Sequence, residues 1–358
     1  MTPAAVSEQL LKYVVLGELA VAVPAVAWIA LHGIWLWRRD LADAPRLARG
    51  RAALAAAVDG PANVDDQHLA ELRRLPARVR RHVVEQLAMS VTGEDGRKVA
   101  AVAASLGLVD AARRRCRSRW WWRRLLGAHQ LNLYGAGDAD LPRLFDDPHP
   151  AVRAQVIEWA GDAGRADLAP RLLAALEDDS PLCRYSAADS ILRSGAPVVD
   201  ALVGELAQRS GRELGHIMEV LAHRPDPRYS RAALDATAND LGAVRAAAAA
   251  LLGGIGGAEA GTALGSLLRD TEPAVRAAAA DGLRRLGHQE AAPSLAPLLR
   301  DPSFEVRRAA GAALAGLGAG GILLLRHYAG DLDPRTSDMA RYSLDMAGLR
   351  GAGSSPPH

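Results

Sequence analysis

The chain has 358 residues and a net charge of +2 at pH 7, and 49% of its residues are hydrophobic although only 4% are aromatic. A core built from these mostly non-aromatic side chains favours closely packed helices over a sheet, because strands favour aromatic and β-branched side chains. The two cysteines, Cys116 and Cys183, form no CxxC pair. They fit a reducing compartment and exclude a disulfide framework.

The charge is unevenly distributed along the chain. Residues 38–124 carry 19 Lys and Arg against 10 Asp and Glu, a net charge of +9. Residues 125–358 carry 23 against 29, a net charge of −6. This division predicts that the basic and acidic parts of the chain meet different surroundings.

After a short tail at 1–12, the apolar run at 13–37 predicts a transmembrane helix. Its length as a helix would be about 37 Å, enough to cross a bilayer with some tilt. Tyr13 lies at one end and Trp35 and Trp37 at the other, where interfacial aromatic side chains are expected. A buried core helix is the alternative interpretation, and a cleaved signal peptide fits poorly because the run is too long.

The orientation of this helix follows from its flanking charges. Five arginines follow the helix within residues 38–51, whereas only Lys12 and the amino terminus precede it. The positive-inside rule therefore predicts a single-pass protein of the inner membrane, with the C-terminal part in the cytoplasm. Residues 38–64 are expected to form a basic juxtamembrane helical linker.

Glu18 interrupts the apolar run about one helical turn from its start. A carboxylate in a membrane helix costs free energy unless it reaches the interface or finds a partner. Two interpretations stay open: Glu18 extends to the interface, or it meets a polar group of a partner within the bilayer.

Beyond the first segment the chain repeats itself at a fixed interval. The arginines of recurring Val-Arg pairs include Arg245, Arg276 and Arg307, and Arg153 and Arg184 are separated by the same interval. Gly215 occupies the position where one further arginine would fall. A fixed period of this length predicts a solenoid of stacked units.

The repeating unit is a pair of short helices. Asp-Pro, as at Asp301, ends the first helix, because proline cannot donate and disfavours helix in the residue before it. The second segment is amphipathic and rich in alanine, and Gly318 is placed to end it. Two such helices cannot bury their apolar face alone, so neighbouring units must stack.

The pattern LL-x-D-P…VR-x-AA-x-AL-x-x-LG resembles the HEAT repeat, in the short bacterial form known from phycobilisome lyases. The resemblance implies an all-α, HEAT-like α-solenoid at 138–350, with degenerate repeats at 65–137 and a disordered tail at 351–358. It also implies a structural ladder, in which the aspartate of the turn and the arginine of the second helix link adjacent repeats. By position the ladder residues are Asp147, Arg153, Asp179, Arg184, Arg245, Asp270, Arg276, Asp301 and Arg307.

The stretch RRRCRSRWWWRR at 113–124 contains seven arginines and three consecutive tryptophans. Counting back one repeat from Arg153 reaches Trp122, so the stretch resembles another helix pair with Arg123 or Arg124 in the ladder position. Side chains at 120–122 would fan across about 200°, wider than a core stripe, so at least one tryptophan should lie off the core.

The preceding arginines have no adjacent acidic residues in the sequence, which leaves their role open. They contact anionic headgroups or a membrane-associated partner, or they form a solvated basic face around a packed helix. Nucleic-acid binding is not expected, because the rest of the chain is acidic. The candidate contact residues are Glu18, Arg113, Arg114, Arg115, Arg117, Trp120, Trp121 and Trp122.

The sequence lacks a P-loop, a GxSxG motif, a dinucleotide fingerprint and the His-Glu pairs that HEAT-repeat iron hydroxylases use. His216, Glu219 and His223 would share one helical face, a spacing that can bind metal, but a solvent-facing polar face is favoured. We therefore expect no catalytic residue, no cofactor and no metal.

The sequence thus predicts a membrane-anchored cytoplasmic scaffold that binds protein partners through its HEAT-repeat surface. An accessory subunit of a membrane enzyme, such as an envelope glycosyltransferase, is the partner relationship that we expect, without nucleic acid. The alternative is an enzyme on a HEAT-like scaffold, of lyase or hydroxylase type.

Overall fold

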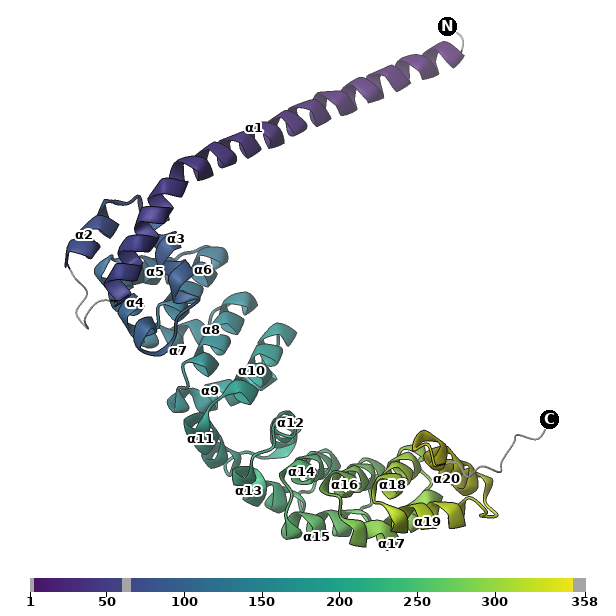
Figure 1. The fold of residues 1–358 in the computed structure, drawn as a ribbon. Helices are drawn as coiled ribbons and strands as arrows, with labels where there is room; N and C mark the ends of the chain where they lie inside the picture. The colour runs from purple at the N-terminus through teal and green to yellow at the C-terminus, as the bar shows by residue number, and fades with distance from the viewer. Residues whose placement is uncertain (1–2, 60–65, 350–358) are drawn as a thin grey trace. The chain divides into compact units, whose positions relative to one another are not determined.

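The structure, a computed structural model, describes residues 3–59 and 66–349, and within the first helix it leaves out the side chains of 3–19 and a few others. The described residues form helices and contain no strand. The chain divides into two units, Met1–Ala139 and Asp140–His358 (Figure 1).

The helices of the first unit are α1 (Pro3–Asp59), α2 (Asp66–Arg74), α3 (Ala77–Ala88), α4 (Gly93–Ser105), α5 (Leu108–Cys116) and α6 (Trp121–Leu133). The C-terminal part of α1 contacts α2 and α3, and its Leu54 is buried together with Leu72 and Val84. The segment expected as a separate linker at 38–64 is thus continuous, up to Asp59, with the apolar run before it.

The structure contradicts the predicted transmembrane helix at 13–37 and, with it, the predicted inner-membrane localisation. Within the described part of the chain, no helix is long and apolar enough to cross a bilayer. Crossing takes about 20 consecutive apolar residues. The side chains of 23–35 are exposed, so this part of the segment is not a core helix either. Glu18 lies outside the described side chains.

The second unit begins within a short 3-10 helix, η1 (Asp138–Asp140), and continues as alternating first and second helices of repeats. The first helices are α7 (Leu141–Phe145), α9 (Ala169–Ala174), α11 (Ala196–Leu206), α13 (Ser230–Ala236), α15 (Ala258–Leu267), α17 (Ala292–Leu295) and α19 (Ala319–Tyr328). The second helices are α8 (Pro150–Asp162), α10 (Pro181–Arg193), α12 (Gly211–Leu221), α14 (Gly242–Ile255), α16 (Pro273–Leu286), α18 (Phe304–Gly316) and α20 (Pro334–Met346).

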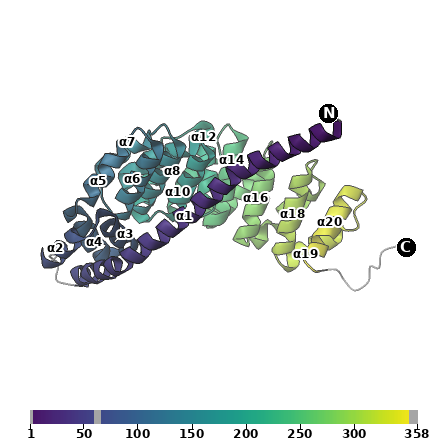
Figure 2. The same cartoon turned by 90° about the horizontal axis from the view of Figure 1, so that it is seen from above.

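Further 3-10 helices extend the first helices of several repeats: η2 (Ala166–Leu168), η3 (Ala175–Glu177), η4 (Pro227–Tyr229), η5 (Gln289–Ala291) and η6 (Ala296–Arg300). In both views of this unit the second helices from α8 to α20 follow one another in a row (Figures 1 and 2). The prediction of an all-α, HEAT-like solenoid is confirmed.

Small residues let the second helices of adjacent repeats approach closely. A Cβ atom at Gly253 of α14 would meet the Cα of Gly282 in α16, and one at Gly161 of α8 would lie 2.6 Å from the Cβ of Ser190 in α10. These glycines therefore have no room for a side chain. The alanine- and glycine-rich composition thus produces the close helix approach expected from it.

One pair of successive second helices departs from this stacking. The packing is close between α8 and α10, between α12 and α14, and onward to α18, but α10 and α12 barely touch. Gly215 does not cause this separation, because it faces α14, where an added Cβ would lie 3.3 Å from Cγ2 of Val244. The weak junction lies between α10 and α12.

Candidate binding surface

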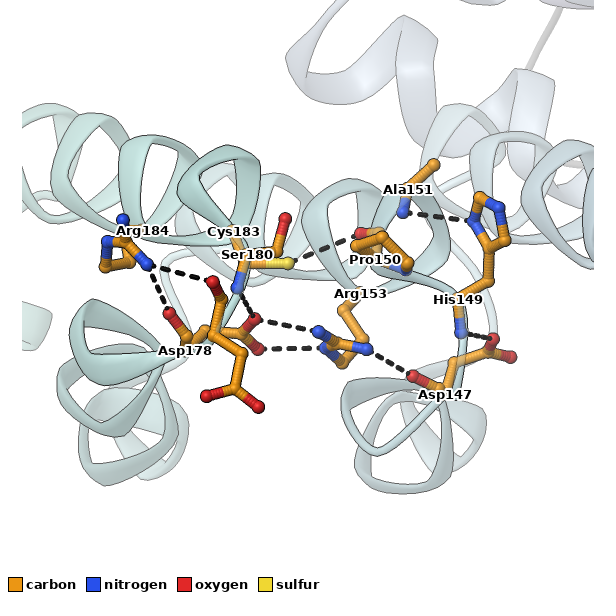
Figure 3. A network of polar contacts seen from close by, with 10 residues as sticks. Asp147, His149, Pro150, Ala151, Arg153, Asp178, Ser180, Cys183 and Arg184 are labelled. Carbon is orange, nitrogen blue, oxygen red and sulfur yellow. Dashed lines mark hydrogen bonds and ion pairs between the residues drawn. The ribbon is translucent and has the colours of Figure 1, made fainter.

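The ladder between repeats starts with a turn that the aspartate side chain stabilises. Asp178 accepts the backbone N–H of Ser180 through Oδ1 at 2.8 Å, just before α10 begins (Figure 3). Asp147 accepts the N–H of His149 in the same way at 2.9 Å before α8. The carboxylate is thus fixed three residues before the first residue of each second helix. This turn orients it to accept hydrogen bonds from an arginine.

Arg153 of α8 joins two consecutive turns (Figure 3). Its Nη1 donates to the backbone oxygen of Asp147 at 2.8 Å, while Nε and Nη2 donate to the Asp178 carboxylate of the following repeat at 2.9 and 2.7 Å. The hydrogen bonds from Arg153 hold the pKa of Asp178 below its usual value. A bidentate arginine–carboxylate pair of this kind is strong and geometrically specific.

The same bridge recurs further along the unit. Arg245 donates to both carboxylate oxygens of Asp270 at 2.7 Å, and Arg276 donates to those of Asp301 at 2.7 and 2.9 Å. Each arginine also bonds to a backbone oxygen six residues before it, at 2.8 Å in both cases. Complete rungs of this kind therefore stand at Arg153, Arg245 and Arg276.

Asp178, and not the predicted Asp179, is the acid of the first complete rung. The two aspartates are adjacent, but only Asp178 stands three residues before Pro181, the first residue of α10. Asp179 contributes its backbone oxygen, which accepts from Nη1 of Arg184 at 3.1 Å. The spacing from the helix start, and not the Asp-Pro motif, determines which acid pairs.

Two predicted ladder arginines, Arg184 and Arg307, anchor to their own turns but pair with no carboxylate of the described residues. Nη1 of Arg184 donates to the backbone oxygens of Asp178 and Asp179, and Nη1 of Arg307 donates to that of Asp301 at 2.8 Å. For Arg184, the acid's position in the following turn holds Arg209. For Arg307 that position holds Asp331, three residues before Pro334 of α20, but Nη2 of Arg300 donates to the Asp331 carboxylate instead.

The basic and aromatic stretch follows the same local plan in the first unit. Ser118 Oγ accepts the N–H of Trp120 at 3.2 Å, as the aspartates do in the complete rungs. Nη1 of Arg124 donates to the backbone oxygens of Ser118 and Arg119 at 3.0 and 3.1 Å. Of the two predicted candidates, Arg124 therefore takes the ladder position, and Trp121 is the first residue of α6.

All three tryptophans are exposed, because they lie at the start of α6 and not along its packed face. Trp120, Trp121 and Trp122 are 40%, 39% and 48% exposed. The rings of Trp120 and Trp122 stack with centroids 4.7 Å apart, and the guanidinium of Arg119 lies 4.5 Å from the centroid of the Trp120 ring. The buried contact of α6 with α5 is made elsewhere, around Gly127.

The arginines before the tryptophans do not form one uniform patch. Arg113 lies 3.7 Å from Asp110, an acidic partner one helical turn earlier, so this cluster does have an acid beside it. Arg115 turns inward and donates to buried Gln130 at 2.8 Å, and Gln130 donates to Glu85 at 2.6 Å. Burial lowers the pKa of Arg115.

The remaining arginines, Arg114 and Arg117, are exposed. An open pocket beside them is lined by Ala111, Arg114, Arg115, Ser118 and Arg123. We call the exposed set of Arg114, Arg117, Arg119, Arg123 and the three tryptophans the Arg-Trp surface. The contact residues predicted from the sequence did not include Arg119 or Arg123, although both belong to the same stretch.

The possible metal face at α12 does not assemble. Nδ1 of His216 lies 2.9 Å from Oε1 of Glu177 in η3, and Nδ1 of His223 lies 2.9 Å from the backbone oxygen of Glu219. Across the described residues, no group of three or more His, Cys, Asp or Glu side chains could hold a metal ion.

Comparison with known proteins identifies the repeat. The family model of HEAT repeats matches residues 138–233 and 230–315. No curated protein sequence matches the chain.

Solved structures resemble the fold at low sequence identity. Human deoxyhypusine hydroxylase in complex with glycerol is 20% identical over 80% of this chain and 97% of that one, with a TM-score of 0.30. The complex of CpcE and CpcF of phycocyanin lyase from Nostoc sp. PCC7120 is 18% identical over 67% and 94%, with a TM-score of 0.30. A mutant of Kap121p is 14% identical over 96% of this chain but 45% of that one, with a TM-score of 0.49.

These likenesses concern the fold alone. The family match, the repeating helix pairs and the arginine–aspartate rungs agree with one another over the same residues. The chain therefore carries HEAT repeats at 138–315, within a HEAT-like solenoid.

Proposed function

We propose that the chain is a scaffold that binds an acidic protein segment through the Arg-Trp surface of its first unit. The observation that carries this proposal is the exposure of three adjacent tryptophans among exposed arginines. Tryptophan and arginine are the residues most enriched at the energetic centres of protein interfaces. Adjacent exposed aromatic side chains rimmed by charge are typical of an interaction site.

The arrangement of the rings supports this role physically. Trp122 stacks on Trp120 and stands edge-on to Trp121, with ring centroids 6.1 Å apart in the second pair. Arg119 covers the Trp120 ring. Rings held by one another lose little conformational entropy when a partner covers them, so their burial contributes more fully to affinity.

The charge around the rings favours an acidic partner. Arg114, Arg117 and Arg123 are exposed and make no ion pair with a described residue, whereas Arg113 is already close to Asp110. Such charges raise the association rate for a negatively charged partner and fix its orientation. The partner proposed here is defined only by its acidic segment, and not as a membrane enzyme or a glycosyltransferase.

A catalytic role on the same scaffold is the alternative to binding alone. Two of the similar solved structures are of a hydroxylase and of a lyase, but their likeness concerns the fold only. A metal or chromophore that copurifies with the full chain would favour the catalytic alternative. The scaffold role predicts a purified chain without either.

Photo-crosslinking from the Arg-Trp surface tests the proposal. A photoreactive amino acid at position 121 of the full chain should link, in cells, to a protein through an acidic peptide that mass spectrometry identifies. The purified partner should then bind the chain, and Trp120→Ala with Trp122→Ala should weaken this binding at least about tenfold, which corresponds to about 1.4 kcal/mol.

The matched control is Trp28→Ala, because Trp28 is an exposed tryptophan on α1, 71% exposed and far from position 121 in the sequence. It should leave partner binding unchanged. Equal loss for both changes, or crosslinks only to lipid or nucleic acid, would contradict the proposal.

A further inference from the structure

The complete rungs show what an arginine of this ladder binds. In all three, the backbone oxygen six residues earlier fixes Nη1, and Nε and Nη2 are left side by side for one carboxylate. The carboxylate then accepts two hydrogen bonds of 2.7 to 2.9 Å, as Asp178, Asp270 and Asp301 do. This geometry suits a planar carboxylate.

Arg184 of α10 has the backbone oxygens that fix Nη1 but lacks the carboxylate that Nε and Nη2 would bind. Its Nη1 is fixed by the backbone oxygens of Asp178 and Asp179 at 2.8 and 3.1 Å (Figure 3). Its Nε and Nη2 make no hydrogen bond to a described residue. The side chain is therefore held in place with its carboxylate-binding nitrogens available.

The following repeat places a basic residue where the acid should be. Arg209 stands one repeat after Asp178, and it bonds to Glu205 at 3.1 Å and to Glu213 at 2.5 Å. Glu205 of α11 and Glu213 of α12 are thus both engaged by Arg209. Because α10 and α12 barely touch, the missing carboxylate is not replaced by close helix packing.

Exposed apolar side chains flank the open rung. Leu182 and Tyr185, on either side of Cys183 and Arg184 in α10, are 49% and 73% exposed. A peptide whose carboxylate reached Arg184 would therefore also cover apolar surface. Arg307, the other arginine without a carboxylate partner, is less accessible, because its Nε is buried and the ring of Phe304 lies 5.8 Å from its guanidinium carbon.

We propose that Arg184 is a binding site for an aspartate or glutamate side chain of an acidic peptide, which completes the rung that the chain leaves open. The peptide's carboxylate occupies the position that Asp178 occupies at Arg153, and its neighbouring side chains contact Leu182 and Tyr185. This site lies in the second unit and does not depend on the Arg-Trp surface.

The chain's own rung provides a probe. A fluorescein-labelled, capped peptide with the sequence of residues 267–275, LLRDTEPAV, carries the aspartate that Arg245 binds in the intact chain. Fluorescence polarisation should show binding to the full chain, and Asp270→Asn in the peptide should weaken it at least about tenfold. Arg184→Gln in the chain should weaken it as much.

Three further variants separate recognition from stability. Arg209→Asp supplies an internal carboxylate to Arg184 and should also abolish peptide binding, whereas Arg209→Ala should retain it. Arg276→Gln removes a complete rung and should lower stability while peptide binding stays. The proposal fails if the peptide does not bind the full chain, if Arg184→Gln binds as well as the original chain, or if Arg209→Ala loses binding as Arg209→Asp does.

Discussion

Arg276 and Asp301 belong to successive repeats and share two hydrogen bonds of 2.7 and 2.9 Å, with their side chains only 12% and 6% exposed. The same arginine donates to the backbone oxygen of Asp270 at 2.8 Å, and the Asp301 carboxylate accepts the N–H of Ser303 at 2.8 Å. One residue pair thus ties together the turns before α16 and α18. The stacking of repeats therefore depends on polar rungs as well as on apolar packing.

We predict that Arg276→Gln lowers the free energy of unfolding by about 3 kcal/mol, because it leaves the Asp301 carboxylate buried without its cation. Urea denaturation followed by circular dichroism measures the change. Arg308→Gln is the control, since Arg308 and Glu305 lie 3.0 Å apart but are more than half exposed. It should cost no more than about 0.5 kcal/mol, and similar losses for both variants would contradict the role of the rung.

We predict that a complete rung makes stability depend on pH in the acidic range. The hydrogen bonds from Arg245 hold the pKa of Asp270 below its usual value. A carboxyl whose pKa is lower in the folded chain stabilises it above the unfolded value of about 3.9, and this contribution is lost as the pH falls through the folded pKa. Arg245→Gln should therefore flatten the decline in melting temperature below about pH 4. An unchanged slope would show that Asp270 contributes nothing to it.

We predict that Gly127→Ala destabilises the first unit, because α5 and α6 approach each other at this residue. An added Cβ would lie 2.7 Å from Sγ of Cys116 and 2.8 Å from the backbone oxygen of Ala112. Overpacking of this kind costs about 1 to 3 kcal/mol. Denaturation of the full chain measures it.

The matched control is Gly265→Ala in α15, where an added Cβ meets nothing within 4 Å. Because alanine has the higher helix propensity, this change should stabilise the chain by up to about 1 kcal/mol. A stabilising effect of Gly127→Ala would show that the two helices can separate without cost.

The sequence predicted the repeat because its signals are local and recur. The spacing of Arg245, Arg276 and Arg307, together with the small residues between them, is visible without any structure. The choice between Asp178 and Asp179 was not visible, because two adjacent acids satisfy the same pattern and only the start of α10 distinguishes them.

The sequence could not predict how the arginines of the candidate site divide between interior and surface. Arg114 and Arg115 are identical neighbours, yet only Arg115 meets Gln130, a residue of a different helix. Long-range contacts of this kind depend on tertiary packing. For the apolar run at 13–37, composition alone favoured a membrane span, and the described residues contain no such span.

We predict that the junction between α10 and α12 is the weakest in the second unit. Its rung is open at Arg184, and the side-chain contacts that bridge it are exposed: His216 pairs with Glu177, with side chains 41% and 53% exposed, and Arg224 donates to the backbone oxygens of Leu192 and Ser194. Exposed pairs contribute little stability. Backbone amides at 209–225 should therefore exchange with deuterium at least about tenfold faster than those at 270–315, where the Arg276–Asp301 rung is complete. Mass spectrometry of the full chain measures both segments in one experiment, and equal protection would show that apolar packing alone determines how the repeats open.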